Sequence, residues 1–495
     1  MDPSLSSPSF GSGCVGELDG DPYPEIAFGA YFGSESLYVV DAESGNLKWG
    51  FYAGGGPLDA SVIMLDVQGD SANEVVFAAS WGILFCLDSA GDLVWRYPTS
   101  GYINCIDSPT GVADFDGDGK PELVFGAWQG DVYMLNAEDG SLVWHANIGP
   151  SSYIQSEPNI MDVNRDGTLD VVVAQYAGPC RVYALDGLDG DTIWSFAAGD
   201  YIYHGGSFVD LDGDYMEEIV VGSYDNYLYC LNAENGSEKW RTYFSGYPPI
   251  GPTSLADLDL DGDYEIIAAT TGINVLDHKG NLLWSRPTSG SCFRGASVAD
   301  MDGDGFLDLV YGADDGVLRC LRGYDGDTVF IFDADSNGFD NAPVIYDFNN
   351  DGNLDVFVVG GYPEEYGTAY CLFTDGTSLG HGWETFRHDH YHTGCFDGVV
   401  GTREDDAGRP SALAVAAWPN PARAEIVFSC MLPGPGELAI SVYDPSGRLV
   451  WQISENGEAG ERSCHWNPGE VAQGVYLYVA RSGNQVARGR LIIAR

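Results

Sequence analysis

The sequence predicts an all-β protein, in which an eight-bladed β-propeller over residues 1–396 is followed by a linker, 397–411, and a small β-sandwich, 412–495. Three observations predict this fold. An acidic loop recurs eight times, a glycine turn ending in a large aromatic residue recurs in phase with it, and the charge pattern changes near the C-terminus. The repeats decide the fold, because a repeat that is missed leads to the wrong architecture.

The acidic loop is clearest in the segment DFDGDGKPE, residues 114–122. Counted from Asp114, carboxylates stand at positions 1, 3, 5 and 9, with a glycine at position 6. Calcium prefers six to eight oxygen ligands, and alternate acidic residues around a sharp glycine turn supply them. An EF-hand would need a glutamate at position 12 and flanking helices, but position 12 is Phe125 and both flanks are apolar and β-prone. The loop therefore predicts a calcium site between two strands.

The loop has eight copies, which begin at residues 17, 66, 114, 162, 210, 257, 300 and 347, at intervals of 43–49 residues. We expect each copy to bind calcium through the side chains at positions 1, 3, 5 and 9 and the carbonyl oxygen at position 7. Several ions, up to eight, are expected, and Gln68 at position 3 makes the second loop the expected vacancy. The candidate ligands are Glu17, Asp19, Asp21, Glu25, Asp66, Asp70, Glu74, Asp114, Asp116, Asp118, Glu122, Asp162, Asn164, Asp166, Asp170, Asp210, Asp212, Asp214, Glu218, Asp257, Asp259, Asp261, Glu265, Asp300, Asp302, Asp304, Asp308, Asp347, Asn349, Asp351 and Asp355.

A second pattern repeats in phase with the loops. In VYMLNAEDGSLVW, residues 132–144, an alternating strand leads through a glycine turn to a second strand that ends in a large aromatic residue, which is typical of a hairpin. With the two strands beside the acidic loop, each repeat has four short strands, the pattern of a propeller blade. The aromatic residues are Trp49, Trp95, Trp144, Trp194, Trp240, Trp284, Phe330 and Trp383.

Both patterns resemble known repeats. The acidic loop followed by ELVFGA or EIAFGA resembles the FG-GAP repeats of integrin-type propellers. The unit LYVVDAESGNLKW resembles the PQQ-like, tryptophan-docking repeats of pyrroloquinoline-quinone propellers. The resemblance covers about residues 9–396. It implies a propeller that binds calcium, but it does not specify a function, because propellers support many unrelated activities.

The charge of the chain limits its partners and its location. The net charge is −52, and because seven Arg balance seven Asp or Glu in residues 411–495, all of it belongs to the first 410 residues. A nucleic acid would require a basic face, so we expect no such partner. No apolar run is long enough to span a membrane. Residues 1–10 do not resemble a signal peptide, yet such loops suit millimolar calcium, so we expect an extracellular or bacterial cell-surface protein whose leader is absent from this chain.

The C-terminal segment predicts a separate module. Short alternating strands with frequent turns indicate a β-sandwich. The order PNP, VYDPSGRLV, HWNP and GVYLYVA resembles the C-terminal sorting domain of type IX secretion substrates and the Ig-like module of flagellar hook-capping proteins. The first resemblance implies export across the outer membrane and surface attachment. The alternative is a sandwich that only caps the chain.

The face of the propeller opposite the acidic loops is rich in aromatic residues. In an antiparallel blade, the acidic loops share one face with the glycine turns, and the remaining connections lie on the other. Aromatic rings with scattered polar groups are favoured at binding surfaces, so this face could bind a carbohydrate or a protein, although the rings could instead pack blade on blade. The candidate residues are Tyr31, Trp81, Trp128, Tyr176, Tyr224, Tyr362, Tyr203, His204 and Arg294.

Two classes of function fit these observations. The first is a secreted or cell-surface calcium-binding propeller that acts in binding, adhesion or as a scaffold. The alternative is a propeller enzyme, either a quinoprotein dehydrogenase or a calcium-dependent polysaccharide lyase. Many quinoprotein dehydrogenases use two adjacent cysteines, which this chain lacks, and no nucleophile–base pair stands out, so we name no catalytic residue and favour a non-enzymatic function. The sequence leaves the oligomeric state open.

Overall fold

The computed structural model describes residues 11–377 and 414–493, apart from short gaps within each range, and every regular element in this part is a β-strand. The chain divides into two compact units. The larger comprises Met1–Leu258 with Tyr264–Thr402, and the smaller comprises Asp259–Asp263 with Arg403–Arg495. An all-β fold is therefore confirmed, whereas the exact domain limits stay a prediction.

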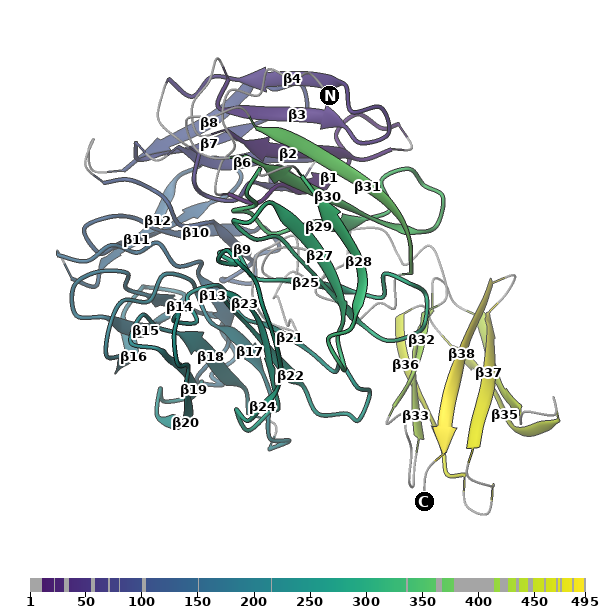
Figure 1. Ribbon diagram of the computed structural model, residues 1–495. Coiled ribbons are helices and arrows are strands. Elements are labelled where there is room, and N and C mark those ends of the chain that lie inside the picture. Colours follow the sequence, from purple (N-terminus) through teal and green to yellow (C-terminus); the bar gives the residue numbers. More distant parts are fainter. Residues whose placement is uncertain are drawn as a thin grey trace. The chain divides into compact units, whose positions relative to one another are not determined.

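The larger unit is a succession of antiparallel sheets in chain order (Figure 1). The first four sheets contain β1 (Cys14–Gly16), β2 (Glu25–Gly29), β3 (Leu37–Asp41) and β4 (Leu47–Phe51); β5 (Ile63–Leu65), β6 (Glu74–Ala79), β7 (Ile83–Leu87) and β8 (Leu93–Pro98); β9 (Gly111–Ala113), β10 (Glu122–Gly126), β11 (Asp131–Asn136) and β12 (Leu142–Asn147); β13 (Asn159–Met161), β14 (Asp170–Ala174), β15 (Arg181–Asp186) and β16 (Thr192–Ala197).

The next four sheets repeat the arrangement. They contain β17 (Ser207–Val209), β18 (Glu218–Gly222), β19 (Tyr227–Asn232) and β20 (Glu238–Tyr243); β21 (Ser254–Ala256), β22 (Glu265–Thr270), β23 (Gly272–Leu276) and β24 (Leu282–Pro287); β25 (Ser297–Ala299), β26 (Asp308–Tyr311), β27 (Val317–Arg322) and β28 (Thr328–Asp333); β29 (Val344–Tyr346), β30 (Leu354–Gly360) and β31 (Thr368–Gly376). The eighth has three strands in the described part, and the strand expected to end at Trp383 lies outside it.

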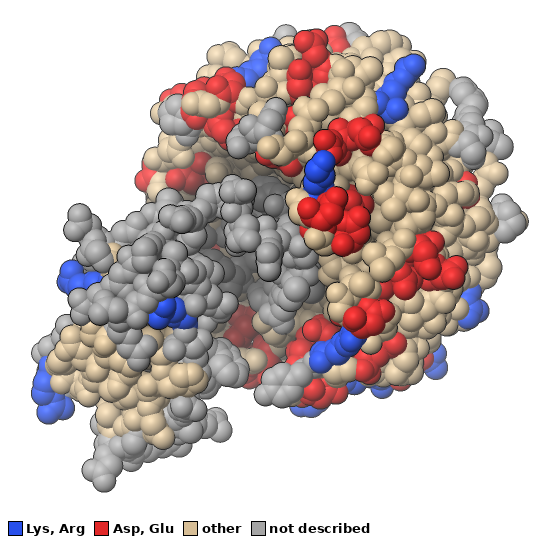
Figure 2. Space-filling model, turned by 180° about the vertical axis from the view of Figure 1, so that it is seen from behind, with Lys and Arg blue, Asp and Glu red and all other residues tan. Residues whose placement is uncertain are grey.

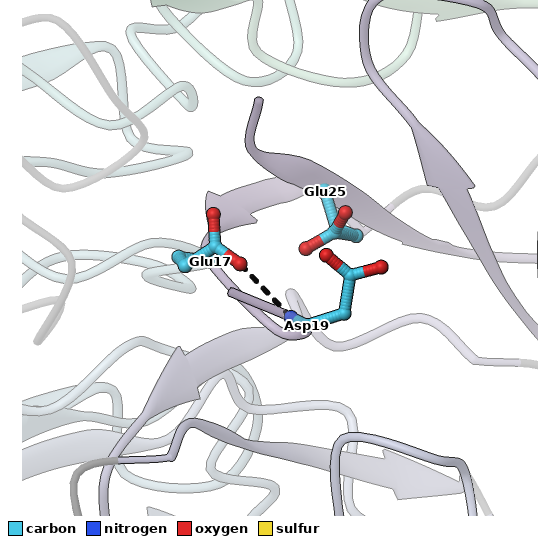
Figure 3. Close-up of side chains that lie close together, drawn as sticks. All are labelled: Glu17, Asp19 and Glu25. Carbon is cyan, nitrogen blue, oxygen red and sulfur yellow. Dashed lines mark hydrogen bonds between the residues drawn. The ribbon is translucent and has the colours of Figure 1, made fainter. Parts of the chain in front are cut away.

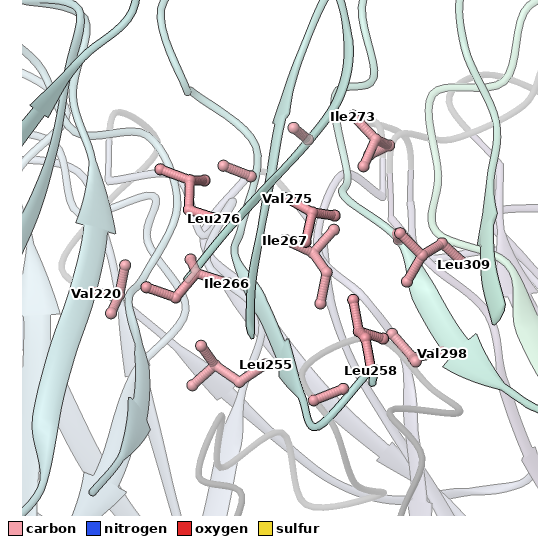
Figure 4. Close-up of a cluster of buried hydrophobic side chains, with 14 of the residues drawn as sticks. Val220, Leu255, Leu258, Ile266, Ile267, Ile273, Val275, Leu276, Val298 and Leu309 are labelled. Atoms are coloured by element: carbon pink, nitrogen blue, oxygen red, sulfur yellow. The ribbon is translucent and has the colours of Figure 1, made fainter. Parts of the chain in front are cut away.

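The sheets pack face to face through apolar side chains. One core cluster joins Val220 of β18 to Leu255 of β21, and Val298 of β25 to Leu309 of β26, so it links three successive sheets (Figure 4). The last sheet also meets the first, because β1 contacts β29 and the rings of Phe28 and Phe357 lie 5.6 Å apart (Figure 1). The sheets of the larger unit therefore form a propeller-like succession whose two ends adjoin.

Tryptophan side chains link five of the sheets to the next one in the chain. The indole N–H of Trp144 donates to the carbonyl oxygen of Gly187 at 2.8 Å, and its ring lies against Gly190. Gly190 has a φ of 77°, and a Cβ there would lie 2.8 Å from the ring. The same indole-to-carbonyl bond joins Trp49 to Ser89, Trp95 to Ala137, Trp194 to Ala233 and Trp284 to Gly323, at 2.8–3.0 Å.

A second set of hydrogen bonds links the innermost strands. The first residue of β13, Asn159, donates its side-chain N–H to the carbonyl oxygen of Gly206, just before β17, at 2.7 Å. The hydroxyl groups at the equivalent positions of the next three sheets do the same at 2.6 Å: Ser207 to Thr253, Ser254 to Ala296, and Ser297 to Pro343. These bonds hold neighbouring sheets at a constant separation along their inner edges.

The smaller unit contains two antiparallel sheets with a common core. Ile426 and Phe428 from one sheet share a buried cluster with Ile440 and Tyr478 from the other. Alternate residues of each strand face this core, which explains the alternation in the sequence. The sheets contain β32 (Ala414–Trp418), β33 (Ile426–Leu432) and β36 (Gly460–Trp466), and β34 (Gly436–Tyr443), β35 (Leu449–Gly457), β37 (Gly474–Ser482) and β38 (Gln485–Ile493).

The contact between Trp144 and Gly190 can be tested by substitution. We expect Gly190→Ala to destabilise the protein by about 2–5 kcal/mol, since it adds a steric clash to the cost of a positive φ. Gly54→Ala is the matched control, because Gly54 has a φ of 90° with no atom within 4 Å of a built Cβ. Denaturant midpoints at fixed calcium would measure both, and equal losses would show that the ring contact contributes nothing.

Candidate functional site: the acidic loops

The acidic loops connect the first and second strands of their sheets. Position 9 opens the second strand, as Glu25 does in β2 and Asp308 in β26. Although these side chains are charged, none of the eight is more than 5% exposed. Burial of a carboxylate is costly unless it is hydrogen-bonded and paired with a cation. The eight are Glu25, Glu74, Glu122, Asp170, Glu218, Glu265, Asp308 and Asp355.

One oxygen of the position 9 carboxylate is committed to the backbone. In loop three, Glu122 Oε2 accepts the N–H of Phe115, at position 2, at 2.8 Å. The equivalent bond measures 2.7–3.1 Å in loops one, two, four, five, six and seven. The other oxygen is buried and has no hydrogen-bond partner among the described residues at Asp170 (Oδ1) and Asp308 (Oδ1). Two buried carboxylate oxygens therefore lack a hydrogen-bond donor from the described part of the chain, which is unfavourable for a charged group.

The electrostatics of these carboxylates lead to the same conclusion. Burial, with the neighbouring Asp side chains of the loop, raises the pKa of Glu122, Asp170 and Asp308 to about 7 and that of Asp355 to about 6. Carboxylates are crowded here where water screens them poorly. A bound cation would remove this cost.

The loop backbone is formed by short-range hydrogen bonds. In loop three, Asp114 accepts the N–H groups of Gly117 and Gly119 at 2.7 and 2.9 Å, and Asp118 accepts that of Lys120 at 2.8 Å. Position 4 has a positive φ in all eight loops, including the non-glycine residues Arg165 (58°), Leu260 (60°) and Asn350 (56°). Such a conformation costs a non-glycine residue about 1 kcal/mol or more. The turn is therefore maintained even where the residue disfavours it.

The carboxylates converge as the sequence predicts. Oxygen atoms of Asp114, Asp116 and Glu122 lie within 4.8 Å of one another in loop three. Glu17, Asp19 and Glu25 do so in loop one, where Figure 3 shows them facing one another. Asp210, Asp212 and Glu218 form the equivalent group in loop five. Figure 2 shows the acidic side chains gathered in separate clusters on the visible face of the larger unit.

Four further predicted ligands belong to loops two, four and eight. Asn164 and Asn349 accept the N–H groups of Asp166 and Asp351, each at 2.9 Å, as aspartates at position 3 do elsewhere. In loop two, Asp66 Oδ1 accepts the N–H of Gly69 at 2.7 Å. Asp70 lies outside the described residues.

Two lysines that the sequence reading did not single out enter the acidic loops. The ammonium of Lys48 pairs with Asp19 and Glu25 in loop one. That of Lys239 lies 2.6 Å from oxygens of both Asp212 and Glu218 in loop five. Both lysines directly precede a repeat tryptophan, and that position is the sequence signal that could have revealed them.

The aromatic candidates divide into exposed and packed residues. Trp81 is 44% exposed, whereas the Trp128 ring lies 4.7 Å from that of Tyr153. Tyr176 contacts the rings of Tyr201, Tyr203 and Tyr224 at 5.0–6.2 Å. Tyr31 and Tyr362 lie outside the described residues. Packing between neighbouring connections therefore accounts for part of this set, and nearly half of the Trp81 surface is exposed.

A buried polar cluster unites the remaining candidates. His204 Nδ1 lies 2.8 Å from Glu157 Oε1, and Arg294 Nη1 lies 3.5 Å from the same oxygen. All three side chains are buried, and the rings of Tyr203 and Phe293 lie 4.8 and 5.4 Å from the ring of His204. The sequence analysis named His204 and Arg294 but missed Glu157, because its basic partners come from other repeats.

Comparison with known proteins agrees with the repeats and the C-terminal module. A model of the FG-GAP-like repeat matches residues 114–173 and 282–358, and a model of the secretion system C-terminal sorting domain matches residues 416–494. The chain carries FG-GAP-like repeats and a type IX sorting domain. The sorting domain indicates an extracellular or cell-surface location. In the described part, no helix is long and apolar enough to cross a membrane.

Solved structures resemble the chain in fold. The biofilm matrix protein Bap1 of V. cholerae has a TM-score of 0.57 at 15% identity, over 77% of this chain and 90% of that one. Sqt1 of Saccharomyces cerevisiae has a TM-score of 0.55 at 12% identity, over 74% and 96%. The computationally designed protein Ika8 has a TM-score of 0.51 at 16% identity, over 74% and 99%. No curated protein sequence matches the chain.

Proposed function

We propose that this protein is a secreted or cell-surface calcium-binding propeller that acts in binding, adhesion or as a scaffold. The observation that carries the calcium assignment is the buried, unpartnered oxygen at position 9 of loops four and seven. The neighbouring charges that raise the pKa of Asp170 and Asp308 are all carboxylates, so the atoms available to an ion there are oxygens. Such a donor set selects a hard cation, and six or more oxygens from a flexible loop suit calcium better than magnesium.

Several calcium ions would be held, one in each suitable loop, with up to eight loops available. In loop seven the ligands would be Asp300, Asp302, Asp304 and Asp308, with the carbonyl oxygen of Phe306. A bound ion would neutralise the crowded carboxylates and fix the turn between the first two strands of the sheet. Its role is therefore to stabilise the fold rather than to take part in a reaction.

The architecture that we propose has eight blades and an Ig-like C-terminal sandwich. Eight sheets in the described part of the larger unit, and the contact between β1 and β29, support a ring of eight. Two sheets around one core support the sandwich. Eight blades would also agree with the eight acidic loops, one in each sheet.

The binding role rests on location and on the exposed aromatic side chains. The sorting domain indicates that the chain reaches the outside of the cell. Trp81, Tyr201 and Tyr153 are 37–44% exposed and lie on connections opposite the acidic loops. Bap1, which shares the fold, is a biofilm matrix protein, and a role at the surface fits this likeness. A carbohydrate or a protein is the partner that we propose.

The enzymatic alternative receives less support from the charged groups of the aromatic face. A quinone cofactor with several carboxylates would need cationic groups to bind it. Arg294 and His204 both contact Glu157, so these two candidate groups already have a carboxylate partner in a buried position. The field of a chain with a net charge of −52 also opposes an anionic ligand.

Removal of calcium tests the proposed stabilisation. At a free concentration about ten times the dissociation constant, each site adds roughly 1.4 kcal/mol, and several sites together approach the stability of a typical domain. We therefore expect excess chelator to lower the Tm sharply and calcium to restore it. A melting curve that chelator leaves unchanged would contradict the proposal.

The substitution Asp308→Asn separates metal binding from charge repulsion. Without metal at pH 8, the variant should melt above the wild type, because one crowded negative charge is gone. In calcium it should melt below the wild type, because a ligand is lost. Glu234→Gln is the control. It removes the same charge at a site outside the acidic loops, because Glu234 is exposed in a turn. The same shift of Tm in both buffers would argue against a metal in loop seven.

The binding role can be tested at Trp81. If this face binds polysaccharide or a surface protein, Trp81→Ala should weaken that binding by about tenfold or more, in line with the loss of an exposed aromatic contact. Tyr243→Ala is the matched control, because Tyr243 is 59% exposed on the outer strand β20. Affinity electrophoresis in gels that contain extracellular polysaccharide provides the measurement, and equal retention of both variants would exclude Trp81 from the binding surface.

A further inference from the structure

The position that precedes each repeat aromatic has a special geometry. In the first seven sheets, the pairing of the third and fourth strands shifts at a β-bulge, and the extra residue directly precedes the tryptophan or Phe330. A bulge re-aims the side chain of its extra residue. These extra residues are Lys48, Val94, Val143, Ile193, Lys239, Leu283 and Val329.

In two sheets this residue is a lysine, and it reaches the acidic loop of its own sheet. Lys239 contacts the position 3 and position 9 carboxylates, Asp212 and Glu218, both at 2.6 Å. Lys48 contacts the equivalent pair, Asp19 and Glu25. Both lysine side chains are 21% exposed, so most of each is enclosed. In the other five sheets the extra residue is apolar and brings no charge.

The two loops that a lysine contacts also depart from the repeat at position 6. Position 6 is a glycine with a φ of 88–96° in loops three, four, six, seven and eight. This glycine forms the sharp turn of a calcium loop. Loops one and five have Pro22 and Tyr215 at that position. Loop two has Ser71 with an apolar bulge residue, Val94, so the loss of glycine does not by itself bring a lysine.

We propose that Lys48 and Lys239 take the place of calcium in loops one and five, as permanent counter-ions supplied by the chain. This inference rests on the proposed function, because it divides the loops into metal-dependent and metal-independent classes. An ammonium between the carboxylates at positions 3 and 9 occupies the region where an ion would bind. A divalent cation about 4 Å from it would meet a repulsion of several kcal/mol near a protein surface.

The test compares position 3 in loops five and three. At saturating calcium, Asp116→Ala should lower the number of bound ions by one per chain, whereas Asp212→Ala should leave it unchanged. Alanine is used because asparagine, which stands at position 3 in loops four and eight, could still bind an ion. Native mass spectrometry of the full chain gives the count. Loss of one ion from the Asp212→Ala variant, or an ion in loop five of a crystal grown in calcium, would overturn the inference.

A second measurement keeps the inference distinguishable from the proposed function. In chelator, Lys239→Met should lower the Tm by a few degrees, because it leaves two carboxylates without their cation. Lys279→Met is the control with the same charge change, since Lys279 is exposed in a turn outside the acidic loops. If the wild type binds no calcium at all, the proposed function fails. If Lys239→Met and Lys279→Met melt alike in chelator, the lysine inference fails, whatever the wild type binds.

Discussion

The structure depends on a carboxylate that is buried where the second strand of every sheet in the larger unit begins. One oxygen accepts the N–H of the second loop residue, as Glu122 does from Phe115, so the path of the loop and the start of the strand are fixed together. The other oxygen is buried, and at Asp170 and Asp308 no described residue donates to it. Since the remaining loop positions are also acidic, the fold concentrates negative charge at the points that hold its strands in register. A cation would offset this charge, and we propose that either a metal or a lysine supplies it.

Two further sets of contacts make the sheets act together. Near the outer edge, an indole such as that of Trp144 bonds to the next sheet and rests on a glycine that has no room for a side chain. Near the inner edge, Asn159, Ser207 and their equivalents bond to the carbonyl oxygen before the next inner strand. Because these two sets of contacts join neighbouring sheets, each set passes stability from one sheet to the next. Under the proposed function, a loop that lost its cation would weaken a local unit first.

The sequence predicts the periodic features well, because every copy of a repeat gives the same evidence. For this reason, position 9, the glycine turn and the tryptophan can be recognised in the sequence. The serine in SFVD and SLAD also repeats, but its role is evident only from the structure. Features that occur only once or twice cannot be recognised from the repeat pattern. Lys48 and Lys239 read as ordinary surface charges until the bulge is seen to turn them inward. The cluster of Glu157, His204 and Arg294 joins residues 137 positions apart, which no local pattern reveals.

The antiparallel sheets separate the two activities that we propose. The acidic loops lie at one end of the strands, and the connections that carry Trp81 and Tyr201 lie at the other. A metal ion cannot touch a ligand bound at the opposite end, so calcium can affect binding only by holding each sheet together. Loops one and five, where a lysine pairs with the carboxylates at positions 3 and 9, would keep their sheets formed when calcium is scarce. In a ring of eight, the first and fifth sheets would lie diametrically opposite each other. Each of the other six sheets would then be at most two positions from one of these two sheets, which do not depend on the metal.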